Sequence, residues 1–160
     1  MSVDLVPHVL FLIRECFEGR PAGKDYTWFV EGKEGIFDAL ESTGAEIASV
    51  KPSLECASIA AHTFHIRYAL RGANAYLGGP EQEGDWESTW AKQEVSEEEW
   101  ADLKADVRHQ YEFFVKFFEA NPSIEQEDHA IGFLAQLPHM AFHLGAIRQI
   151  MKIVQLPHLR

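Results

Sequence analysis

The segment that decides the fold is residues 96–118, which read SEEEWADLKADVRHQYEFFVKFF. It opens with a capping box, because Ser96 Oγ can accept a hydrogen bond from the N–H of Glu99 while the Glu99 carboxylate accepts one from the N–H of Ser96. An apolar stripe follows at intervals of three or four residues, the period of one face of an α-helix. Its members are Trp100, Leu103, Val107, Tyr111, Phe114 and Phe118. The segment predicts a long amphipathic helix that ends at Asn121-Pro122.

Three further segments show the same period. The first covers Val6, Val9, Ile13 and Phe17 and ends near Gly19. The second begins after Pro52, with Ser53 as candidate cap, and runs to the breaker Gly78-Gly79-Pro80. The last covers about Ile131 to Val154.

Pro138 interrupts this last segment. A proline inside a helix removes one hydrogen bond and costs ~3 kcal/mol or more. Either the helix is kinked at Pro138, or its regular part starts near Leu137 and residues 131–136 form a separate turn.

The connections between these helices also constrain the fold. A short amphipathic piece is expected over residues 36–40, closed by Gly44, and residues 24–34 and 81–94 are expected to be loops. The acidic loop 81–94 carries Trp86 and Trp90 and is long for a simple hairpin, so an up-down-up-down order is not required. No useful β alternation and no repeat is present. The sequence therefore predicts an all-α fold, a four-helix bundle, with residues 1–160 as a single domain.

Composition narrows the class of protein. The chain has 160 residues, 46% hydrophobic and 24% charged, which is typical of one globular domain. Its 14 basic and 25 acidic side chains give 14 − 25 = −11, a balance that disfavours nucleic acid and anionic membranes as partners. Cys16 and Cys56 are too few for a disulfide framework and are interpreted as small core residues. The first residues lack a basic leader and the apolar run at 9–13 is too short to span a membrane, so we expect a cytoplasmic protein.

Histidines are the candidate functional residues, and the chain has eight. His139 and His143 are four residues apart and project from one helical face, a spacing at which two imidazoles can bind one metal ion. They share their stripe with Ile147, Ile150 and Val154 and are expected to point inward. The alternative is a pair of hydrogen-bonded core histidines.

A third ligand is expected from the helix that precedes Gly78. Periodicity favours His62, which shares a stripe with Ile59 and Ile66, over His65, which lies off it. Three histidines with other positions open to water are typical of a catalytic metal site. The remaining histidines have no partner at ligand spacing and are interpreted as surface or packing residues: His8, His109, His129 and His158.

Two segments carry a resemblance to a known family. Residues 58–66, SIAAHTFHI, and residues 139–150, HMAFHLGAIRQI, resemble the DinB/YfiT-like superfamily. The resemblance implies a four-helix bundle, often dimeric, with one divalent metal bound by one histidine of the second helix and two of the last. The second-helix ligand of that superfamily directly precedes an aliphatic residue, as His65 precedes Ile66. The resemblance therefore selects His65, His139 and His143 as metal ligands, with His62 as the runner-up or as a residue that supports a ligand.

The resemblance also implies an activity. The metal would be Zn²⁺ or Ni²⁺, with iron as a further candidate, since imidazole suits all three. Relatives of this kind are thiol S-transferases or hydrolases, so the expected substrate is a small molecule, including a low-molecular-weight thiol, and the expected assembly is a homodimer. The alternative is a non-catalytic metal-binding or stress-related helical-bundle protein.

No catalytic general base can be named from the sequence. Arg67, Tyr68 and Arg148 are candidates for anion binding or for supporting the ligands, although surface ion pairing is the favoured interpretation of the two arginines. The tryptophans suit the mouth of a substrate site, but packing against the bundle is the favoured interpretation.

Overall fold

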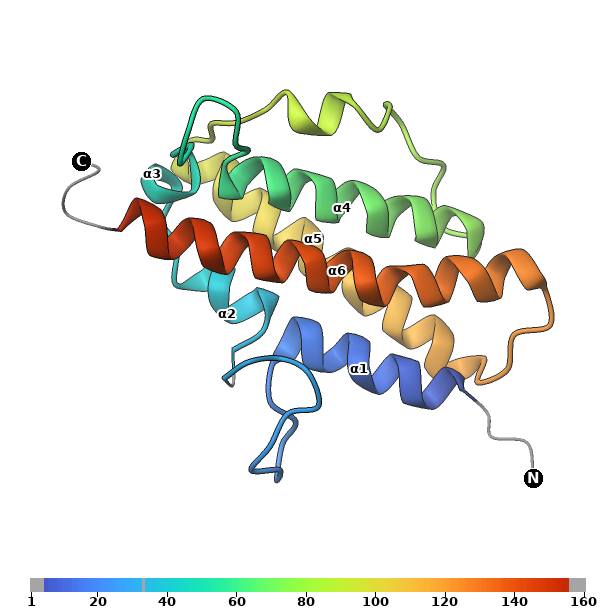
Figure 1. The fold of residues 1–160 in the computed structure, drawn as a ribbon. Coiled ribbons are helices and arrows are strands. Elements are labelled where there is room, and N and C mark those ends of the chain that lie inside the picture. The colour runs from blue at the N-terminus through green and yellow to red at the C-terminus, as the bar shows by residue number, and fades with distance from the viewer. Residues whose placement is uncertain (1–4, 33, 156–160) are drawn as a thin grey trace.

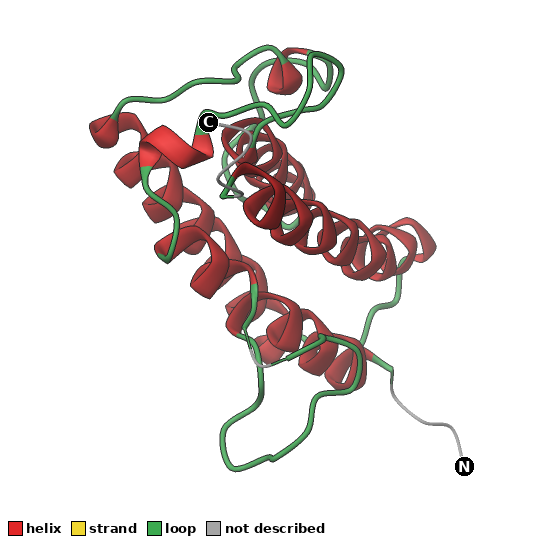
Figure 2. Cartoon of the chain, turned by 60° about the vertical axis from the view of Figure 1, so that its left-hand side comes forward, coloured by secondary structure: helices red, strands yellow, loops and turns green. Residues whose placement is uncertain are grey.

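The computed structural model describes residues 5–32 and 34–155, and no strand is present within these ranges. The helices are α1 (Val6–Glu18), α2 (Ile36–Glu41), α3 (Ala45–Ala48), α4 (Ile59–Tyr76), α5 (Glu97–Ala120) and α6 (Glu127–Val154), with a short 3-10 turn η1 (Ser88–Trp90). Figure 2 shows helices joined only by loops. The predicted all-α fold is confirmed.

The four long helices lie side by side around one core. Helices α4 and α1 each contact both α5 and α6. Helices α4 and α5 run in the same direction, because the segment between them crosses back along the outside of α4 (Figure 1). The length of the acidic loop thus permits a parallel neighbour where a short hairpin would impose an antiparallel one. The same crossing brings η1 against α4.

Helix α5 agrees with the sequence prediction at both ends. Ser96 and Glu99 form the capping box, with Glu99 N donating to Ser96 Oγ at 3.2 Å and Ser96 N donating to the Glu99 carboxylate at 2.9 Å. All six members of the predicted stripe are buried. The Trp100 indole N–H also donates to the Thr43 carbonyl at 2.7 Å, which fixes α5 against the connection between α2 and α3.

Helix α4 begins later than predicted. The cap is Ser58, whose Oγ accepts from Ala61 N, and Ser53 is an exposed loop residue, so its interpretation as the cap is wrong. The reason is tertiary, because Ser58 also bonds twice to Gln93, 35 residues away. Cys56 is exposed in the same loop, which corrects its interpretation as a core residue.

Helix α6 begins at Glu127, before the predicted Ile131, and continues through Pro138. The separate turn is therefore the wrong alternative. Two features favour a continuous helix: the Pro138 ring faces solvent, and Phe133 and Met140 on either side of it are buried in the core. Packing on both sides offsets the hydrogen bond lost at the proline.

Helix α6 is the one described helix that has the length and apolar composition of a membrane span. The core helix of a soluble protein meets the same criterion, so this finding by itself is weak. Part of the apolar surface of α6 is exposed, including Ile131 and Phe142. The opposite side packs on α1 and α4 and contributes two of the candidate ligands.

Candidate metal centre

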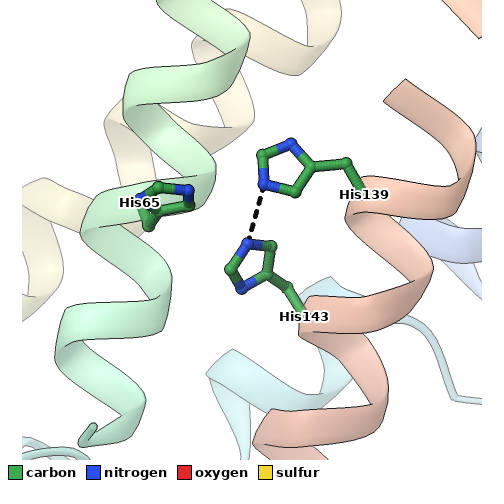
Figure 3. Close-up of side chains that lie close together, drawn as sticks. All are labelled: His65, His139 and His143. Carbon is green, nitrogen blue, oxygen red and sulfur yellow. Dashed lines mark hydrogen bonds between the residues drawn. The ribbon is translucent and has the colours of Figure 1, made fainter. Parts of the chain in front are cut away.

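Three histidines from two helices converge in the space between α4 and α6. His65 projects from α4, and His139 and His143 project from successive turns of α6 (Figure 3). One ring nitrogen from each lies within 4.8 Å of the others. His65 and His143 are each only 1% exposed, whereas His139 is half-buried. The structure thus brings together the three residues that the resemblance selected.

The spacing of the α6 pair fits a shared metal ion. His139 Nε2 and His143 Nε2 are 3.0 Å apart. Two nitrogens bound at ~2.1 Å lie about 3.0 Å apart when they subtend a right angle at the ion and about 3.4 Å apart in a tetrahedron. The donors therefore lie close to the spacing that one ion requires, with little movement of either ring.

The preference for His62 over His65 was based on a single apolar stripe of α4, which is narrower than the surface that α4 buries. His65 lies between Ala61 and Ala69, and all three are buried together with the Ile59 stripe. Helix α4 is covered by α5, α6 and η1 at once, so its buried surface is wider than one stripe. His62 is also buried, and its Nδ1 lies 2.9 Å from His143 Nδ1, on the side of His143 that faces away from His139.

All four rings are held neutral. Burial, followed by the neighbouring His139, His62 and His65, lowers the pKa of His143 to about 2. Burial, followed by His139 and His62, lowers the pKa of His65 to about 4, and burial alone lowers that of His62 to about 4. Burial also lowers the pKa of His139. Only a neutral imidazole has a lone pair to offer a metal, so these rings are ready to coordinate at neutral pH.

The loop between α4 and α5 (residues 77–96), which crosses back along the outside of α4 and is called the crossing loop below, supplies the walls of the site. Trp90 stacks on His65 with ring centroids 4.2 Å apart, and Trp86 meets the same ring edge-on at 4.1 Å. Trp86 also stacks over His139 at 5.6 Å and is 52% exposed, so it lies between the histidines and solvent. Trp86 and Trp90 therefore border the histidine cluster, whereas Trp100 packs in the core.

Thr89 is a site residue that the sequence did not reveal. Its Oγ1 lies 2.7 Å from His65 Nδ1, and it belongs to η1, 24 residues further along the chain. A single threonine in an acidic loop carries no pattern that would single it out. Only the path of the crossing loop places it against α4.

Of the other candidate residues, Tyr68 reaches the wall of the site, where its ring meets Trp86 edge-on at 6.0 Å, whereas Arg67 and Arg148 lie elsewhere. Arg67 pairs with Asp106 at 3.8 Å, and Tyr68 donates to the Gly84 carbonyl at 3.2 Å. Arg148 lines a groove of about 180 Å³ between α6 and the loop at Phe29. Among the remaining histidines, His8 and His109 are exposed and His129 is half-buried, while His158 lies outside the described residues.

Comparisons of the chain with protein-family models, with curated proteins and with solved structures find no match. The chemistry of the site therefore has to be argued from its own geometry. Three neutral nitrogen donors, two of them on adjacent turns of one helix, form a set that suits a divalent transition metal.

Proposed function

We propose that this chain is a metal-dependent enzyme of the DinB/YfiT-like type, a four-helix bundle in which His65, His139 and His143 hold one divalent metal ion. The proposed reaction is transfer of a low-molecular-weight thiol, with hydrolysis as the second reaction of the same site. The observation that carries the proposal is the convergence of three neutral imidazoles from α4 and α6.

The donor set favours an open, positively charged centre. Three protein ligands leave coordination positions free, and zinc, nickel and iron all accept imidazole. When bound, such an ion lowers the pKa of a coordinated thiol or water, so that the conjugate base forms at neutral pH and can attack an electrophile. Among the described residues no carboxylate belongs to this ligand group, so the ligands themselves would not neutralise the ion. An anionic exogenous ligand would do so.

The walls favour sulfur over oxygen as that ligand. Trp86 and Trp90 pack directly on the ligand rings, and sulfur makes favourable contacts with aromatic rings. A small molecule would approach on the side of Trp86, which is partly exposed, and of the half-buried His139. We further propose a cytoplasmic homodimer without nucleic-acid or membrane partners, which agrees with the net charge of −11.

Elemental analysis tests the metal centre. The protein is purified without a His-tag or chelator, beside His143→Ala and the control His109→Ala, which removes an exposed histidine of α5. We expect one divalent metal per chain in the wild type and the control and none in His143→Ala. The wild type and the control are then assayed for transfer of small thiols and for hydrolysis.

Two results would change the proposal. An absence of metal in the wild type, with no stabilisation on addition of Zn²⁺ or Ni²⁺, would leave a structural cluster of four histidines, in which His143 bonds to His62 and His139 and His65 bonds to Thr89. Metal without turnover in either assay would favour the non-catalytic metal-binding protein. Both measurements can be made on the full chain.

A further inference from the structure

His65 has its second ring nitrogen committed to a hydrogen bond. The Thr89 hydroxyl has one proton, which it donates to the Trp86 carbonyl at 2.7 Å. Its oxygen therefore accepts at the 2.7 Å contact with His65 Nδ1, and His65 must donate from that nitrogen. A neutral imidazole carries one N–H, so the His65 lone pair lies on Nε2.

His143 lies in a row of three rings. Its Nδ1 is 2.9 Å from His62 Nδ1, and its Nε2 is 3.0 Å from His139 Nε2. With one proton on each neutral ring, the two hydrogen bonds of the row can be arranged in only two ways, because both must run in the same direction along it. Either His143 donates from Nδ1 to His62 and keeps its lone pair on Nε2, or it donates from Nε2 to His139 and has no lone pair at the metal position.

We propose that His62 and Thr89 are positioning residues that hold His143 and His65 in the Nδ1–H form, so that both Nε2 lone pairs face the metal position. His62 is thus not a ligand but the acceptor that orients one. The metal in this proposal rests on the proposed function, whereas the tautomers are a property of the protein without metal.

The arrangement leaves little for metal binding to change. In the metal-free protein, His139 donates from Nε2 to His143 Nε2. For an ion to enter, His139 has only to release that proton to solvent and take one up on Nδ1, which keeps the ring neutral. The His62 ring is itself confined, since it is 7% exposed and meets Trp90 edge-on at 5.3 Å. Hydrogen-bond partners behind metal-bound histidines contribute about 10- to 100-fold to metal affinity.

Two matched pairs of variants separate positioning from packing. His62→Asn keeps an acceptor oxygen close to the position of Nδ1, whereas His62→Leu removes it. Thr89→Ser keeps the hydroxyl, whereas Thr89→Val keeps only the shape. Ring tautomers are read from long-range ¹H–¹⁵N correlation spectra of the metal-free protein at pH 7.5, and Zn²⁺ affinity from competition with a chromophoric chelator.

We expect Nδ1-protonated His65 and His143 in the metal-free wild type. His62→Leu and Thr89→Val should each weaken Zn²⁺ binding about 10- to 100-fold while keeping one ion per chain. His62→Asn and Thr89→Ser should recover most of that affinity. The tautomer of His143 should change only in His62→Leu, and that of His65 only in Thr89→Val.

Nε2-protonated His143 or His65 in the wild type would overturn the proposal, and so would unchanged affinity in both His62→Leu and Thr89→Val. Loss of the ion in His62→Leu with retention in His65→Ala would make His62 the ligand instead. A wild type that takes up no Zn²⁺ would refute the proposed function alone, because the spectra of the metal-free protein still decide the tautomers. The wild-type spectra also decide the matter if a variant fails to fold.

Discussion

Lowering the pH from 7 to 5 should destabilise the metal-free protein through its buried histidines. His62 and His65 have native pKa values of about 4 and His143 of about 2, against ~6.5 for a histidine in the unfolded chain. Between these values the unfolded chain binds protons that the native protein does not, so the free energy of unfolding falls as the pH falls. The loss begins as the pH passes through about 6.5 and continues to the native pKa. Linkage gives about 2 kcal/mol for one such histidine between pH 7 and 5.

Three such histidines set an upper bound of about 6 kcal/mol, which is comparable with the whole stability of many domains. Urea denaturation in chelator at pH 7, 6 and 5, followed by tryptophan fluorescence, measures the slope. His62→Phe should reduce the slope by one proton's contribution, whereas His109→Gln, which removes an exposed ring on α5, should leave it at the wild-type value. A free energy of unfolding that does not change between pH 7 and 5 would refute the reasoning.

Three further predictions concern the scaffold. The Glu15 carboxylate, 1% exposed, accepts hydrogen bonds from the backbone N–H groups of residues 28–30. Glu15→Leu should therefore lower the free energy of unfolding by about 3 kcal/mol or more, whereas Glu15→Gln, which keeps one acceptor oxygen, should lower it clearly less. Equal losses for the two variants in urea denaturation would contradict this. Ser58→Ala should lower the free energy of unfolding by about 1 kcal/mol, because it removes the N-cap of α4, and Ser53→Ala should change the melting temperature little. A larger loss of stability in Ser53→Ala than in Ser58→Ala would support Ser53 as the cap, as expected from the sequence. Pro138→Ala should raise the free energy of unfolding by up to about 3 kcal/mol, because it returns a backbone N–H donor to α6 and, at an exposed position, opens no cavity. An unchanged denaturation midpoint would mean that the helix loses nothing at the proline.

The ends of the helices show which signals are local. The start of α5 was predictable because Ser96 and Glu99 bond to each other within one turn. The start of α4 was not, because Ser53 and Ser58 both suit a cap and the choice depends on Gln93, which only the fold brings near. Pro138 is similar, since local energetics argue for a break and core packing on both sides keeps the helix whole.

The candidate site divides in the same way. His139 and His143 could be paired from the sequence, because the geometry of one helix fixes a spacing of four residues on one face. The choice between His65 and His62 could not be made from periodicity, since both are buried on α4. It depended on a resemblance, and the structure places His65 with the α6 pair.

The sequence by itself determined the all-α class, the long apolar stripe of α5 and the paired histidines of α6, because each is encoded within a few turns of one helix. The tertiary structure decided which α4 histidine joins that pair, and it placed Thr89 and His62 behind the rings. Those contacts join residues far apart in the chain. Their distances are set by how α4, α6 and the crossing loop dock, which no local pattern of residues encodes.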